Sequence, residues 1–162
     1  MPDTRTAAPA PAPSAPGAPP KRRVLFLCTG NSARSQMAEG WLRRAAGDAF
    51  DVESAGTEPR PEVHPLAVRV MADAGVDISR QRPKSLGPFV GQPFDFVITV
   101  CDRARDACPV FPDDPVQIHW SFADPAAAAG TEAARTAVFR RIRDTIQYRV
   151  RLFVNAQVRP RG

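Results

Sequence analysis

The sequence of 162 residues is poor in cysteine, with three, and it has no hydrophobic run long enough to span a membrane. Its apolar run at residues 24–28 (VLFLC) is far shorter than the about 20 residues that a transmembrane helix needs. The N-terminal residues also lack the continuous apolar core of a secretory signal. We therefore expect a cytoplasmic protein with no membrane segment. Its thiols should stay reduced, so catalysis or metal binding explains them better than a structural disulfide.

Large apolar side chains are missing from residues 6–20 (TAAPAPAPSAPGAPP), and a segment of this composition cannot bury enough surface to fold. We predict a disordered Pro/Ala-rich tail over residues 1–22. A single domain should follow over residues 23–156, and a short basic tail over residues 157–162.

Negative charge is scarce at both ends of the chain. Residues 1–23 carry a net charge of +3 and residues 131–162 one of +6, which leaves −4 for residues 24–130 out of a total of +5. This distribution argues against nucleic-acid binding. The basic last segment is explained by a solvated helix face, with contact to an acidic partner as the alternative.

Apolar runs and helical patterns alternate along the domain, which indicates βαβ units and an α/β fold. With right-handed crossovers, four parallel strands take the order 2-1-3-4, with helices on both faces of the sheet. Strands are expected at residues 23–27, 50–55, 94–100 and 116–120, and helices at 33–46, 64–74 and from about residue 131 onward.

The last helix should begin after Thr131 as N-cap, with one apolar face that covers the sheet. That face comprises Val138, Ile142, Ile146, Val150 and Phe153. Gly75 is expected to end the second helix, and residues 80–93 read as an extended loop.

Three reactive side chains fall at the carboxyl ends of predicted strands. Cys28 ends the first strand, Cys101 ends the third, and Asp124 follows the fourth by four residues. Ligands of open parallel sheets bind at this edge, where the strand order reverses. We therefore expect these side chains to meet at one rim.

The segment "CTGNSAR" (residues 28–34) predicts an anion-binding loop. Gly30 and Asn31 tolerate a positive φ, so successive N–H groups can face inward, and the following helix adds its positive end. Arg34 can fork two donors onto a tetrahedral oxyanion. The same field should lower the pKa of Cys28, and Ser35 can donate a hydrogen bond to its thiolate. The predicted oxyanion-binding residues are Thr29, Gly30, Asn31, Ser32, Ala33 and Arg34.

Together with "ESAGT" (53–57), "FDFVITVCDRARDACPVFP" (94–112) and "HWSFADP" (119–125), this loop resembles the low-molecular-weight protein tyrosine phosphatases and the arsenate reductases built on their fold. The resemblance runs from Arg23 to about Phe153. It implies Cys28 as nucleophile, Arg34 as oxyanion binder and Asp124 as general acid.

The other two cysteines resemble those of the thioredoxin-coupled arsenate reductases, in which a strand-end cysteine is followed by another seven residues later. Cys101 and Cys108 match that spacing. The phosphatases usually follow Asp-Pro with tyrosine, whereas here Ala126 follows, and Ala33 stands where the reductases often have a further cysteine. The resemblance implies arsenate as substrate and a disulfide relay through Cys28, Cys101 and Cys108. The external reductant would be thioredoxin, glutaredoxin or a small thiol.

Some reductases of this family hold a potassium ion behind the oxyanion loop, and the resemblance suggests a set of ligands for it. The positions are Asn31, Glu39, Ser54 and Asp95. Oxygen ligands suit this hard cation. The alternative is a hydrogen-bond network that braces the loop without metal. No tightly bound cofactor is expected.

Several simpler interpretations stand beside these hypotheses. Cys101 and Cys108 could be buried thiols, or a partial zinc site with His119. We interpret His64 and His119 as structural, and Trp41 and Trp120 as packing residues. The sequence thus predicts a monomeric cytoplasmic arsenate reductase, with a phosphatase and a thiol-based metalloid-sensing binding protein as alternatives.

Overall fold

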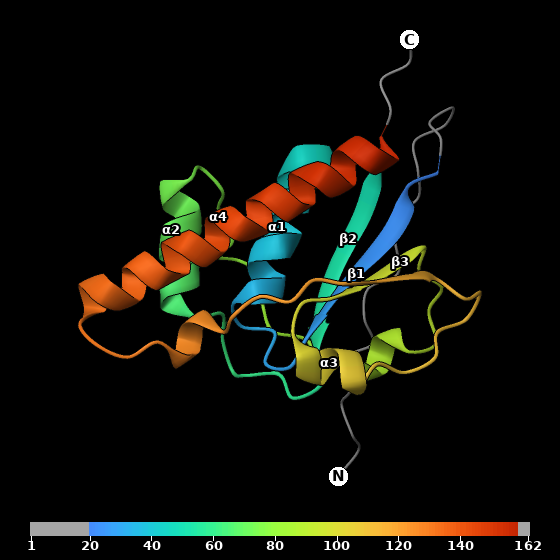
Figure 1. Ribbon diagram of the computed structural model, residues 1–162. Helices are drawn as coiled ribbons and strands as arrows, with labels where there is room; N and C mark the ends of the chain where they lie inside the picture. Colours follow the sequence, from blue (N-terminus) through green and yellow to red (C-terminus); the bar gives the residue numbers. More distant parts are fainter. Residues whose placement is uncertain (1–19, 159–162) are drawn as a thin grey trace.

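The computed structural model describes residues 20–158, and Figure 1 shows their arrangement. Four parallel strands form one sheet in the order β2-β1-β3-β4, which confirms the predicted order. The strands are β1 (Arg22–Cys28), β2 (Phe50–Gly56), β3 (Phe96–Thr99) and β4 (Val116–His119). The helices are α1 (Arg34–Ala46), α2 (Pro65–Asp73), α3 (Asp102–Asp106) and α4 (Glu132–Gln157), with short 3-10 turns η1 (Gly87–Phe89) and η2 (Pro125–Ala127).

The end of α4 covers one face of the sheet. The ring of Phe153 lies 5.4 Å from that of Phe50, 5.1 Å from that of Phe96 and 6.3 Å from that of Trp120, measured between centroids. Side chains of the alternate register, such as Leu25, point to the other face and are fully buried as well. Both faces of the sheet are therefore covered.

Helix α4 lies across α1 and α2 for most of its length (Figure 1). The prediction that its apolar face covers the sheet therefore holds only near Phe153. Phe139 is fully buried and stacks on His64 at 4.6 Å, whereas Val138 is only half-buried. At the start of α4 the buried side chains therefore differ from the predicted ones. This half of the helix packs on α2 rather than on the strands.

Helix boundaries follow the local sequence. Thr131 caps α4 by accepting a hydrogen bond from the amide of Ala134, as predicted. Gly75, with a φ of 85°, follows α2. The predicted loop at residues 80–93 contains the turn η1.

The two predicted tails lie mostly outside the described residues. Arg22, the last residue of the predicted N-terminal tail, belongs to β1, and Gln157, the first of the C-terminal one, belongs to α4. Within residues 20–158, none of the helices is both long and apolar enough to cross a membrane.

Candidate active site

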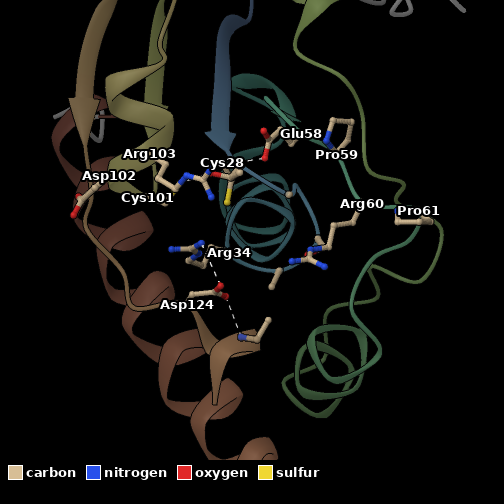
Figure 2. A pocket seen from close by; sticks show the side chains of 15 residues that line it. Cys28, Arg34, Glu58, Pro59, Arg60, Pro61, Cys101, Asp102, Arg103 and Asp124 are labelled. Atoms are coloured by element: carbon tan, nitrogen blue, oxygen red, sulfur yellow. Dashed lines mark hydrogen bonds and ion pairs between the residues drawn. The ribbon is translucent and has the colours of Figure 1, made fainter. Parts of the chain in front are cut away.

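A pocket of about 580 Å³ opens at the carboxyl ends of the strands (Figure 2). Cys28, Arg34, Cys101 and Asp124 line it together, so the predicted convergence is confirmed. Of the predicted oxyanion loop, Thr29, Gly30, Ser32 and Ala33 also line the pocket. Ser35, Asn31 and Cys108 do not, and each lies behind or beside it.

The backbone of residues 28–33 turns all its carbonyl groups away from the pocket. Four of them, those of Cys28, Thr29, Gly30 and Ser32, accept from amides of residues 57–64 at 2.8–3.2 Å. The carbonyls of Asn31 and Ala33 accept from the Gln36 side chain and the Met37 amide, both at 2.9 Å. Within the described chain, the amides of residues 30–35 have no oxygen acceptor. Apart from the Asn31 amide, which donates to the Cys28 sulfur, they are available to an anion, as the nest geometry requires.

Asn31 supplies the backbone reversal of this loop, with a φ of 48°. Gly30 could also have adopted a positive φ but does not do so. The lack of a side chain at Gly30 leaves room for Arg60, whose aliphatic part crosses the loop. A Cβ at Gly30 would lie 3.2 Å from Cγ of Arg60.

Gly56 was not predicted as a site residue, yet it determines how closely β2 approaches the loop. A Cβ at Gly56 would lie 2.5 Å from the carbonyl oxygen of Thr29. Gly56 also pairs with the segment beyond α2, because its amide donates to the Lys84 carbonyl at 2.8 Å. The only signal in the sequence was the "ESAGT" motif itself.

A buried polar network supports the loop from behind. The Asn31 side-chain amide donates to Ser35 at 2.8 Å and to Ser54 at 2.9 Å, and the Ser54 hydroxyl donates to Glu39 at 3.3 Å. Ser35 therefore accepts from Asn31, while its predicted donation to Cys28 stays a prediction. All four side chains are buried.

The four positions suggested for potassium do not form one site. Asn31, Glu39 and Ser54 lie together, but Asp95 precedes β3 at the opposite end of the sheet, where it accepts from the Arg23 amide at 2.7 Å. Beside Glu39 lies the ammonium group of Lys84, 3.2 Å from Oε1. A cationic side chain at this place does not fit a potassium ion among the same ligands. The described residues also contain no cluster of three or more His, Cys, Asp or Glu side chains with metal-site geometry.

Arg34 and Asp124 face each other across the pocket (Figure 2). Nη2 of Arg34 lies 4.0 Å from Oδ2 of Asp124, and Nη1 donates to the Phe122 carbonyl at 3.0 Å. Asp124 also caps η2 by accepting from the Ala126 amide at 3.0 Å. The guanidinium is thus held in place from the segment after β4, with its other donors available to an oxyanion.

Cys101 caps the short helix α3. Its sulfur accepts from the Ala104 amide at 3.4 Å and lies 3.3 Å from the Thr29 hydroxyl. A cysteine at a helix start, surrounded by donors, is held in its thiolate form.

Cys28 and Cys101 titrate as a hydrogen-bonded pair. The hydrogen bond to Cys101 and burial raise the pKa of Cys28, although Arg34 and the Asn31 amide act in the opposite direction. The hydrogen bond from Cys28 lowers the pKa of Cys101 to about 5. The direction of the shift in the Cys28 pKa is opposite to the predicted one, although Arg34 and the Asn31 amide act as the prediction required. Because a charge on one sulfur raises the pKa of the other, the two thiols titrate together.

Cys108 lies at the far end of α3 and is half-buried, with its thiol donating to the Pro109 carbonyl at 3.6 Å. Burial raises the pKa of Cys108 above its usual value. The helix between the two cysteines is mostly exposed, and of its residues Ala104 alone is buried. The segment between the two cysteines is thus a short, weakly buried helix.

Three charged residues at the pocket mouth were not predicted. Glu58 and Arg103 lie opposite each other with 3.8 Å between charged groups, and Arg60 enters from the segment after β2 (Figure 2). A hydrogen bond joins Oδ1 of Asp102, the first residue of α3, to Nε2 of His119 at 2.8 Å. The spacing of these residues in the sequence does not indicate that they lie together.

The remaining histidine and the tryptophans have structural roles, as predicted. His64 caps α2 through Nδ1, which accepts from the Leu66 amide at 3.1 Å. Trp120 packs between Phe26 and Phe153 in the core. Trp41 is buried, and its indole N–H has no partner among the described residues.

The fold and the site define a class of enzyme in which a cysteine at the end of a β-strand acts on a tetrahedral oxyanion held by backbone amides and an arginine. Residues 23–160 match the family of low molecular weight phosphotyrosine protein phosphatases. The chain belongs to this family.

Relatives at higher identity carry a more particular name. The arsenate reductase of Halalkalibacterium halodurans is 47% identical over 133 residues, which cover 82% of this chain and 95% of that protein. The arsenate reductase of Bacillus subtilis is 45% identical, over 80% of this chain and 93% of that protein. Among solved structures, a thioredoxin-dependent arsenate reductase of Corynebacterium glutamicum is similar with a TM-score of 0.68 and 30% identity, over 86% of this chain and 63% of that one.

Proposed function

We propose that this chain reduces arsenate to arsenite, with Cys28 as nucleophile and Cys101 and Cys108 as a disulfide relay. One observation supports this most strongly: a second thiol, Cys101, lines the same pocket as Cys28 at the anion-binding loop. Hydrolysis of a phosphoester needs only one cysteine. A second one beside it, held as thiolate, suits the transfer of two electrons to an oxyanion.

The first step forms a bond between the Cys28 sulfur and arsenic. The Cys28 proton passes to an oxygen of the arsenate dianion, the sulfur attacks arsenic, and one hydroxyl leaves as water with a proton from Asp124. The product is a Cys28–AsO₃H⁻ adduct. Arg34 and the free amides of the loop stabilise the charge on the equatorial oxygens.

The second step reduces arsenic. The Cys101 thiolate attacks the Cys28 sulfur, and the sulfur–arsenic bond breaks with its electron pair on arsenic. Arsenic passes from the +5 to the +3 state and leaves as arsenite after protonation by water. A Cys28–Cys101 disulfide remains.

The third step moves the disulfide outward. The Cys108 thiolate attacks the Cys101 sulfur, and Cys28 leaves as thiolate, ready for another turnover. The resulting Cys101–Cys108 disulfide flanks the exposed helix α3, where a reductant can reach it. Thioredoxin is the reductant we propose, on the similarity to the thioredoxin-dependent enzyme of C. glutamicum.

The walls of the pocket favour a small inorganic substrate over phosphotyrosine. Its lining in the described residues contains no aromatic side chain, while Pro59, Arg60, Arg103 and Ala126 form the outer rim. A phenyl ring would find no stacking partner there. The charged rim instead suits arsenate, which is compact and doubly charged.

Consumption of NADPH in the presence of thioredoxin, thioredoxin reductase and arsenate tests this function. We expect oxidation that depends on arsenate in the wild type and is lost in both Cys28→Ser and Cys101→Ser. Efficient hydrolysis of an aryl phosphate that survives in Cys101→Ser, without NADPH consumption by the wild type, would establish a phosphatase instead. Stoichiometric arsenite binding without turnover would establish a metalloid sensor.

A further inference from the structure

Lys84 is connected to the oxyanion loop through both its backbone and its side chain. Its amide donates to Oδ1 of Asn31 at 2.8 Å, and its carbonyl accepts from the Gly56 amide at 2.8 Å. Its ammonium group lies 3.2 Å from Oε1 of Glu39 and 2.7 Å from Oε2 of Glu53. One residue thus joins the end of β2, helix α1 and the loop.

Glu39 is the reason a cation is needed there. Its side chain is only 2% exposed, and an ionised carboxylate at such depth must be paired. Burial raises the pKa of Glu39, while the charges of Lys84 and Arg43 act against that rise. Arg43 is the more distant partner, at 3.5 Å and half exposed. Lys84 therefore supplies the nearer positive charge.

The effect of Lys84 reaches the loop through Ser54. The Ser54 hydroxyl donates to Glu39 and accepts from the Asn31 side-chain amide. Asn31 is the residue whose positive φ reverses the loop. If Glu39 loses its counter-charge, it will take up a proton or draw in another cation, and the hydrogen bonds that fix Asn31 will change with it.

We infer that Lys84 is a positioning residue that serves as the built-in cation behind the oxyanion loop and takes the place of a metal ion there. The loop of this chain is then organised independently of potassium. The inference rests on the proposed function only for the identity of the oxyanion, so inorganic phosphate can serve as the probe. Failure of arsenate turnover would leave this test intact.

The test measures the dissociation constant of phosphate by calorimetry in potassium chloride and in choline chloride. The wild type should bind phosphate equally in both salts. Lys84→Met keeps the side-chain length without the charge and should weaken binding about tenfold or more in choline chloride, because a buried carboxylate loses its partner. Potassium or ammonium should restore much of that loss, and Lys84→Arg should bind within about threefold of the wild type.

Two further variants distinguish a positioning role of Lys84 from a general disturbance of the structure. Arg82→Met alters a nearby exposed cation that contacts only the Ser79 and Gln81 carbonyls, and it should bind phosphate like the wild type. Lys84→Met combined with Glu39→Gln should bind in choline chloride more tightly than Lys84→Met alone, because residue 39 then carries no buried charge that has lost its nearer partner.

Potassium dependence of the wild type, measured in phosphate affinity or melting temperature, would overturn the inference without any variant. So would Lys84→Met with unchanged affinity in choline chloride. A Lys84→Met protein that fails to fold in choline chloride but folds in potassium chloride would support it. One that folds in neither salt, and is not recovered by Glu39→Gln, would contradict it.

Discussion

At the scale of single residues, the central feature is the pair of thiols, Cys28 and Cys101, that line one pocket. The pKa of Cys101 is lowered and that of Cys28 is raised, each chiefly by the other thiol. In the proposed mechanism, Cys28 becomes the nucleophile when an oxyanion takes its proton, and Cys101 attacks in the step that follows.

Replacing Cys101 should make Cys28 easier to ionise, because the hydrogen bond to Cys101 is the largest cause of its raised pKa. In Cys101→Ala we expect the pH dependence of Cys28 alkylation by iodoacetamide to move to lower pH than in the wild type. Cys108→Ala is the matched control and should leave it unchanged. A shift to higher pH in Cys101→Ala would contradict the coupling.

Asp124→Asn tests the proton donor of the first step. The amide oxygen of asparagine can still accept from the Ala126 amide, as Asp124 does at 3.0 Å, so the fold should be kept. The single-turnover rate of adduct formation should fall by about 10²–10⁴-fold. A rate within about twofold of the wild type would exclude Asp124 from proton transfer.

The residue scale also shows what the sequence could not supply. The strand-end positions of Cys28 and Cys101 were predictable from the alternation of strands and helices. The pairing of their charges was not, because it depends on the Thr29 hydroxyl and the Ala104 amide reaching the Cys101 sulfur. The closeness of Gly56 to the loop, which excludes any side chain there, likewise became visible only in three dimensions.

At the scale of elements, α3 is the segment that has to change. Cys108 lies seven positions after Cys101, which corresponds to roughly 10 Å between their Cα atoms along a helix of 1.5 Å rise. A disulfide needs Cα atoms within about 4.4–6.8 Å. In the proposed relay, closing Cys101–Cys108 requires α3 to unwind, and the hydrogen bond between Asp102 and the His119 ring holds its first turn in place.

Hydrogen exchange of α3 reports this change directly. We expect the amides of residues 104–108 to exchange faster after oxidation by arsenate than in the reduced protein, while those of α1 stay the same. The Ala104 amide is the most informative, because it donates to the Cys101 sulfur in the reduced protein. Equal protection of α3 in the two states would show that the helix persists and that the relay does not close within it.

The order of the sheet was predicted correctly because hydrophobic periodicity and right-handed crossovers leave few alternatives. The buried face of α4 was predicted less well. Its first half packs on α2 through Phe139 and His64, and helical periodicity does not say which neighbour a helix will meet. Short features such as η1 and the ion pair at the pocket mouth depend on contacts between distant segments.

At the scale of the whole molecule, ionisation of the two thiols makes the stability of the fold depend on pH. Cys101 has a folded pKa of about 5 against 9.0 for the free group, so its contribution to stability is present above pH 9 and lost as the pH falls toward 5. Cys28 acts in the opposite sense, because its raised pKa favours the folded state only below pH 9. Stability from the pair is therefore greatest near pH 9.

Urea denaturation in reducing buffer checks this linkage. From pH 5.5 to pH 8.5, the free energy of unfolding should rise more steeply for the wild type than for Cys101→Ala. Cys108→Ala should retain the slope of the wild type. Parallel profiles for the wild type and Cys101→Ala would show that Cys101 does not carry the charge.

The measurement that tests the account most directly is disulfide mapping of the reduced wild type after a single exposure to arsenate without reductant, with the released arsenite counted. We predict one arsenite per chain and a Cys101–Cys108 disulfide, with Cys28 free. In Cys108→Ser the same treatment should stop at a Cys28–Cys101 disulfide, with arsenite still released once. Arsenite release from a wild type in which Cys101 and Cys108 both remain free thiols would contradict the relay.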